Sequence, residues 1–202
     1  MRVFPFHAVL TGILLCLSGT VSPTSAQWTV GVTIGADRFW GGSVETDGEE
    51  RSFRPYRPTV FGIGLEHKGN PFAWGLQIHY AEAGLGLEGQ GAAAVIEGVF
   101  TVLSVSPELV YRITAFGPIT ELRLHAGPLV DIWGIIDEDT RAHVGAQSAV
   151  SLDIPFGGRF AGSALAGVAV IPSPFEAGQL GSTFEPRTLW RRRFAMGLHY
   201  RL

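Results

Sequence analysis

Residues 72–80 read FAWGLQIHY, and residues 194–202 read FAMGLHYRL. In both segments the even-numbered positions are all apolar, whereas the odd-numbered positions are small or polar. A period of two puts successive side chains on opposite faces of an extended strand, while a helix needs a period near 3.6. The two segments therefore predict β-strands that each have one continuous apolar face.

The same alternation extends over most of the chain after residue 27. Six further segments show it less cleanly: Trp28–Asp37, Thr59–His67, Val99–Arg112, Thr120–Trp133, His143–Ile154 and Phe160–Ile171. Three short connections rich in turn residues (68–71, 115–118 and 155–158) alternate with four longer ones. The longer ones are Trp40–Pro58, Glu82–Glu97, Gly134–Arg141 and Pro172–Thr188. This pattern predicts an all-β fold, an eight-stranded antiparallel up-and-down transmembrane β-barrel.

Aromatic residues collect near the ends of the predicted strands, as expected where a barrel crosses the two faces of a bilayer. One belt, at the periplasmic interface, is predicted from Trp28, Phe72, Trp74, Tyr111, Phe160 and Tyr200. A second belt, at the outer interface, is predicted from Phe39, Trp40, Tyr80, Trp133 and Trp190. We therefore expect the chain in a bacterial outer membrane, with its long loops on the outside and available for binding.

The first 26 residues have the pattern of an export signal. Arg2 precedes the apolar run Ala8–Leu17, which is too short to span a bilayer as a helix. Thr24-Ser25-Ala26 places small residues where a signal peptidase cuts. We therefore expect a cleaved signal peptide at 1–26 and a barrel at 27–202.

Charge is scarce in this chain, which has 16% charged and 46% hydrophobic residues, whereas soluble domains carry about 25% charged residues. A net charge of −3 gives no electrostatic case for nucleic-acid binding. A single Cys excludes an internal disulfide and a Cys-based zinc site. The segment Gly84–Gly89 matches G-x-G-x-x-G but lacks the following helix of a dinucleotide site. No catalytic, cofactor or metal site is expected.

Charged residues on the polar faces of the strands point into the barrel, where buried charges need partners. The predicted luminal polar network consists of Glu66, Glu108, Glu121, Arg123, Asp131, Asp153, Arg191, Arg193 and Arg201. Because an eight-stranded interior is only wide enough for side chains, this network predicts a plugged barrel rather than a diffusion pore. Between Arg191 and Arg193, Arg192 faces outward and is predicted near the headgroups, where lipopolysaccharide phosphates can contact it.

The last predicted strand resembles the C-terminal signature of bacterial outer-membrane proteins. Its alternating residues are Phe194, Met196, Leu198, Tyr200 and Leu202, with an aromatic third from the end, although Leu202 replaces the usual terminal Phe. The resemblance implies recognition by the barrel-assembly machinery. Signal, strand count and ending together resemble the small eight-stranded families: OmpA-type transmembrane domains, OmpX-like proteins and the outer membrane protein beta-barrel domain group. Residues 105–112 and 125–128 are similar to a strand-turn-strand of that last group.

The favoured function is a non-enzymatic one, membrane-structural or surface-interacting, in contact with outer-membrane lipids and lipopolysaccharide. Three alternatives stay open. A lipid A-modifying enzyme could use His143, Ser151 and Asp153 as a triad, although nothing in their spacing requires it. A small-solute channel would need an open interior. A soluble periplasmic barrel of lipocalin type would point its apolar residues inward, and alternation alone does not distinguish it from a membrane barrel.

Overall fold

The computed structural model describes residues 28–45, 52–89, 92–116, 120–135, 140–175 and 184–202. The predicted signal peptide, 1–26, lies outside the described residues. Eight strands form the fold: β1 (Trp28–Glu45), β2 (Ser52–His67), β3 (Phe72–Gly89), β4 (Ala92–Phe116), β5 (Thr120–Ile135), β6 (Arg141–Gly157), β7 (Phe160–Ile171) and β8 (Phe184–Arg201). The described residues contain no helix long and apolar enough to cross a membrane.

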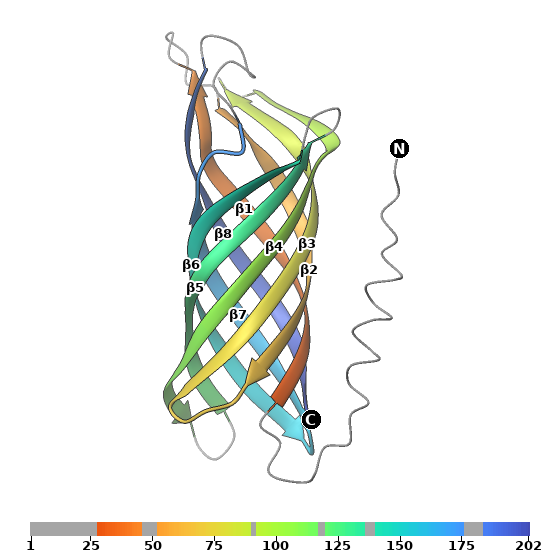
Figure 1. The fold of residues 1–202 in the computed structure, drawn as a ribbon. Coiled ribbons are helices and arrows are strands. Elements are labelled where there is room, and N and C mark those ends of the chain that lie inside the picture. Colours follow the sequence, from red (N-terminus) through yellow and green to blue (C-terminus); the bar gives the residue numbers. More distant parts are fainter. Residues whose placement is uncertain (1–27, 46–51, 90–91, 117–119, 136–139, 176–183) are drawn as a thin grey trace.

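The strands close into one barrel in which each strand pairs antiparallel with its neighbours in sequence, and β8 pairs with β1. Figure 1 shows the tilted strands and the C-terminus at the end where β1 begins. We call this end the terminal end, because Thr29 pairs there with Arg201, and the opposite end the distal end. The predicted eight-stranded antiparallel up-and-down barrel is confirmed.

Alternation places apolar side chains outside the barrel and polar ones inside. On the outer face, Phe61 is 56% exposed and Met196 is 71% exposed. On the inner face, Asp37 and Asp131 are buried. A soluble barrel requires the reverse arrangement, since water would then contact the outer face. The lipocalin-like alternative is therefore wrong.

Several strands are longer than the sequence predicted, and the predicted long loops are correspondingly shorter. The predicted loop Glu82–Glu97 is almost entirely strand, since β3 ends at Gly89 and β4 starts at Ala92. Most of the predicted loop Trp40–Pro58 likewise belongs to β1 and β2. Apolar and polar residues alternate along a strand only where one of its faces contacts an apolar medium. The parts of the strands that extend beyond the apolar medium therefore do not show the alternation.

At the distal end the barrel wall divides into two ribbons. Pairing of β1 with β2 ends at Ala36 and Thr59, whereas β1 stays paired with β8 as far as Glu45. On the other side of the gap, β2 stays paired with β3 as far as Ser52. The outer parts of β3 and β4, yellow-green in Figure 1, project beyond the closed wall. A hydrogen bond from Arg54 Nη1 to the carbonyl of Phe39, 3.2 Å long, crosses the gap.

The aromatic belt predicted at the terminal end forms pairs on the outer surface. Trp28 contacts Trp74, Phe72 contacts Tyr111 and Phe160 contacts Tyr200, with ring centroids 5.0–5.2 Å apart. At the distal end, Trp40 and Trp190 stack 5.9 Å apart.

The distal belt was predicted to include Phe39 and Trp133, and this prediction is wrong. Their side chains are 5% and 0% exposed and lie inside the barrel. Their odd numbers put them on the same strand faces as Asp37 and Asp131, which point inward. Alternation within a strand therefore decided their direction, and nearness to a strand end did not.

Candidate functional site

The interior of the barrel holds ion pairs near both ends. Toward the terminal end, Arg123 on β5 lies between two carboxylates from different strands. Its Nη2 donates to Glu66 Oε1 at 2.6 Å, and its Nη1 donates to Asp153 Oδ2 at 2.9 Å. The three side chains, which we call the Arg123 cluster, are 10–17% exposed. One guanidinium thus connects β2, β5 and β6 across the lumen.

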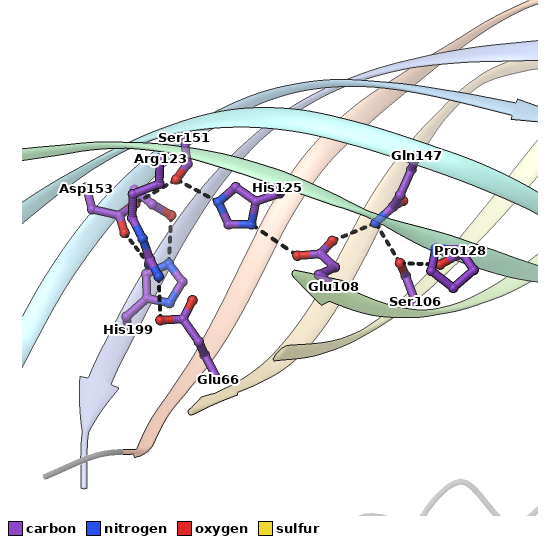
Figure 2. A network of polar contacts seen from close by, with 11 residues as sticks. Glu66, Ser106, Glu108, Arg123, His125, Pro128, Gln147, Ser151, Asp153 and His199 are labelled. Carbon is purple, nitrogen blue, oxygen red and sulfur yellow. Dashed lines mark hydrogen bonds and ion pairs between the residues drawn. The ribbon is translucent and has the colours of Figure 1, made fainter. Parts of the chain in front are cut away.

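A chain of hydrogen bonds continues from this cluster toward the middle of the barrel (Figure 2). Ser151 Oγ lies 3.1 Å from Asp153 Oδ1 and 2.9 Å from His125 Nε2. The other ring nitrogen, His125 Nδ1, lies 3.1 Å from Glu108 Oε2. Gln147 Nε2 donates to Glu108 Oε1 at 2.6 Å and to Ser106 Oγ at 2.8 Å. Polar contacts therefore run without a break from β2 to the centre of the lumen.

A second cluster, nearer the distal end, is more deeply buried. Arg193 donates to both carboxylate oxygens of Asp37, from Nε at 2.7 Å and Nη2 at 2.8 Å. Arg191 Nη1 donates to Asp131 Oδ2 at 3.1 Å, and its Nε lies 3.6 Å from Asp37 Oδ2. Ser104 Oγ donates to Asp131 Oδ1 at 2.6 Å. We call these five residues the Asp37 cluster.

Apolar side chains cover the Asp37 cluster on its distal side. This aromatic cap consists of Phe39, Ala83, Phe100, Val102, Trp133, Phe175 and Leu189, each at most 7% exposed. The Trp133 ring lies 6.0 Å from those of both Phe39 and Phe100. Phe175 belongs to the connection after β7 and packs 5.9 Å from Phe100. The described part of this connection thus reaches back over the lumen.

Between the two clusters lies a small central cavity. Its volume of ≈ 60 Å³ leaves room for a few water molecules. Arg123, His125, Arg191 and Arg193 line it. Among the described protein atoms, Arg191 Nη2 has no hydrogen-bond partner. Because a buried N–H is costly when unpaired, the cavity provides a place for water at this guanidinium.

Seven of the nine predicted luminal residues lie in these contacts: Glu66, Glu108, Arg123, Asp131, Asp153, Arg191 and Arg193. The other two, Glu121 and Arg201, lie nearer the terminal rim, where they line a second cavity. Glu121 forms an ion pair with Arg112 at 3.7 Å, and both side chains are more than a third exposed. The Arg123 cluster lines both cavities and lies between them.

Asp37 and the serine and histidine members of the network were not predicted from the sequence. Asp37 was the last residue of a predicted strand and was not counted as a partner, although alternation places it on the inner face with Thr33. His125, Ser104 and Ser151 follow the same rule, since each lies on the inner face of its strand. The alternation of each strand was thus a sufficient signal for which residues point inward.

The triad suggested from the sequence, His143 with Ser151 and Asp153, does not assemble. His143 pairs in register with Asp131, whereas Ser151 pairs with Arg123. Ser151 instead contacts His125, which in turn contacts Glu108, in the order of a hydrolase triad.

This second arrangement lacks two things that catalysis requires. Ser151 is 3% exposed, so its hydroxyl is not presented to an acyl substrate at the surface. The backbone around Ser151 pairs with β5 and with β7, so its N–H groups are engaged in the sheet and do not form an oxyanion site. The arrangement fits a structural network better than a hydrolase. The G-x-G-x-x-G segment at Gly84–Gly89 likewise lies within β3, not at the start of a helix.

Fold and interior together define the class: a closed eight-stranded up-and-down barrel with an apolar exterior and an ion-paired interior. No protein-family model and no curated protein matches the chain. Among solved structures, the chain is similar to Neisserial surface protein A, with a TM-score of 0.56 and 8% identity over 87% of this chain and 96% of that one. It is also similar to the outer membrane protein OprG from Pseudomonas aeruginosa, with a TM-score of 0.51 and 11% identity over 86% of this chain and 94% of that one. These similarities concern the fold.

Proposed function

We propose that the protein is an integral barrel of the bacterial outer membrane with a structural or surface-interaction role. The observation that carries this proposal is the distribution of polarity over the closed barrel. Large apolar side chains cover the outside, while charged side chains inside are paired with one another. In lipid, a closed sheet satisfies its backbone groups and an apolar exterior meets the hydrocarbon. The two solved structures named above are bacterial surface or outer-membrane proteins by their names.

The contacts along the lumen support a non-conducting interior. The Arg123 cluster, the Asp37 cluster and the aromatic cap lie one after another, and the cavity between the clusters is small. A solute would have to break buried ion pairs and displace Trp133. We therefore favour a plugged barrel over a small-solute channel. Interaction with other molecules would fall to the distal ribbons, which project beyond the closed wall.

Heat-modifiable gel mobility of the outer-membrane fraction tests whether the protein is an integral barrel of that membrane. A closed membrane barrel is expected to migrate differently before and after boiling. A soluble periplasmic protein with no mobility shift would contradict the proposal.

Conductance in planar bilayers tests the non-conducting interior. We expect no conductance from the purified protein, whereas a porin measured as the positive control conducts. Steady conductance would favour the channel instead. A changed lipid A mass spectrum after deletion of the gene would favour the enzyme.

The alternating residues of β8 are proposed to direct assembly. Phe194, Met196 and Leu198 are 45–71% exposed on the outer face and so are accessible to a partner during insertion. Tyr200 packs against Phe160 with centroids 5.0 Å apart, and Tyr111 packs against Phe72 at 5.1 Å. Tyr111→Ala is therefore a matched control for Tyr200→Ala. We expect several-fold less assembled barrel for Tyr200→Ala. Equal loss in both variants would show that the aromatic pair matters and its position does not.

A further inference from the structure

Two arginines lie side by side on the outer face of the barrel. Arg38 on β1 pairs in register with Arg192 on β8, and both side chains are exposed. Like charges directly opposite each other destabilise a sheet. Within the described residues no ion pair joins either guanidinium to a carboxylate, whereas the inward Arg191 and Arg193 are both paired. An anion outside the barrel would therefore relieve a repulsion that the described protein leaves uncompensated.

The two arginines lie at a defined depth in the expected bilayer. Ten residues separate Trp28, in the terminal aromatic belt, from Arg38. At about 3.3 Å per residue and a tilt of about 40°, this is about 25 Å along the barrel axis. The apolar band of an outer-membrane barrel is also about 25 Å tall. Arg38 and Arg192 thus reach the distal edge of the band, the level of lipid headgroups.

The aromatic residues next along the strands hold one of these arginines in place. The Arg192 guanidinium lies 4.5 Å from the centroid of the Trp40 ring. Trp40 in turn stacks on Trp190 with an interplanar angle of 16°. A cation over an indole face loses little freedom when it also contacts a phosphate, because its position is already restricted. Arg192 is therefore partly preorganised for an anion.

A groove on the lipid-facing surface starts beside Arg192. It has a volume of ≈ 280 Å³ and runs over β6, β7 and β8. Its outward-facing lining consists of Ser148, Val150, Ala166, Val168, Arg192 and Phe194. The depression arises at Ala166, which lies between Val150 and Phe194 in register. An apolar groove with a cation at one end matches an acyl chain attached to an anionic headgroup.

We propose that Arg38 and Arg192 bind a phosphate of lipid A in the outer leaflet, with one acyl chain in the groove beside Arg192. This inference rests on the proposed outer-membrane location, which puts the distal end in the lipopolysaccharide leaflet. Two guanidinium groups suit a phosphate because each donates charge-assisted, bidentate hydrogen bonds. The site thus combines a charge contact with a shape contact, and each can be removed separately.

Native mass spectrometry of the full-length protein in detergent tests the site, with bisphosphorylated lipid A as the probe and phosphatidylglycerol as the competing anionic lipid. We expect Arg38→Gln with Arg192→Gln to weaken lipid A binding about tenfold. Arg187→Gln, an exposed arginine five residues away on β8, is the charge control. We expect Ala166→Phe, which fills the groove, to weaken binding several-fold, whereas Ala164→Phe, outside the groove on the same face of β7, leaves it unchanged.

The measured lipid affinities decide whether the proposed lipid A site exists. Unchanged lipid A affinity in the double arginine variant and in Ala166→Phe would overturn the proposal. Equal affinity for phosphatidylglycerol would overturn the assignment to lipid A, because the pair would then bind any anionic lipid. If the double variant loses heat-modifiable mobility, Arg192→Gln and Ala166→Phe decide the question. Absence of the wild-type protein from the outer membrane would defeat the proposed function and leave the binding result in detergent standing.

Discussion

The two ends of the barrel interior hold similar ion pairs in different surroundings. The Arg123 cluster lies next to the terminal rim, and its side chains keep 10–17% exposure. The Asp37 cluster lies under the aromatic cap, and its carboxylates are 0–1% exposed. Where water reaches an ion pair, hydration compensates a charge that loses its partner. In a fully buried pair, no water compensates the remaining charge. The distal cluster should therefore be the more sensitive to loss of a partner.

The largest effect is expected from Asp37→Asn. This change leaves Arg193 without its bidentate partner and takes one of two carboxylates from Arg191. Breaking a buried pair typically costs about 3–5 kcal/mol, since the remaining charge has no compensation. Urea unfolding followed by heat-modifiable mobility measures the loss. Glu82→Gln, an exposed carboxylate on β3, serves as the control, and equal midpoints for the two variants would contradict the expected difference.

A smaller loss is expected from Arg123→Gln. The change leaves Glu66 and Asp153 unpaired, but both side chains are 12–17% exposed and can be partly hydrated. We expect about 1–3 kcal/mol in the same unfolding assay, because hydration offsets part of the unpaired charge. A cost equal to or above that of Asp37→Asn would contradict the greater sensitivity expected of the distal cluster.

Salt should distinguish the ends further. Ions screen charges that water reaches and leave buried pairs almost unaffected. Raising the ionic strength to about 1 M should therefore reduce the cost of Arg123→Gln by less than about 1 kcal/mol and leave that of Asp37→Asn unchanged. Unfolding of both variants and the wild type at two salt concentrations measures this. The opposite order would mean that water reaches the distal cluster.

The smallest effect is expected at the terminal rim. Glu121→Gln breaks the ion pair with Arg112, whose two charged side chains are 42% and 34% exposed. Exposed pairs contribute about 0–1 kcal/mol, so the unfolding midpoint should hardly move. A loss comparable to that of Arg123→Gln would place Glu121 in the interior network after all.

Alternation predicted the barrel, the strand number and the faces of most side chains. It correctly put Arg191 and Arg193 inside and Arg192 outside, because three consecutive residues of a strand must alternate. Alternation failed where the strands extend past the closed wall, since no apolar medium there selects one face. Phe39 and Trp133 were misplaced because an aromatic residue near a strand end is compatible with both faces.

Individual partners could not be predicted from the sequence. Arg193 and Asp37 are 156 residues apart, and Arg123 and Glu66 are 57 apart. Which inward residues share a level depends on the stagger of all eight strands around the barrel, and small errors in strand ends change it. The sequence therefore predicted that charged side chains in the interior form ion pairs. It did not predict which residues are partners.

The division of the distal wall between β1 and β2 has a consequence for crowded membranes. Strand edges that no neighbour covers invite pairing with another chain, and thus uncontrolled polymerisation. On β2 the segment beyond Thr59 contains Pro55 and Pro58, which have no N–H to donate, and Arg57, whose φ of 31° interrupts the extended backbone. Such an edge is a poor template for an added strand. On its β2 side, the opening in the wall is thereby protected against pairing with a neighbouring copy.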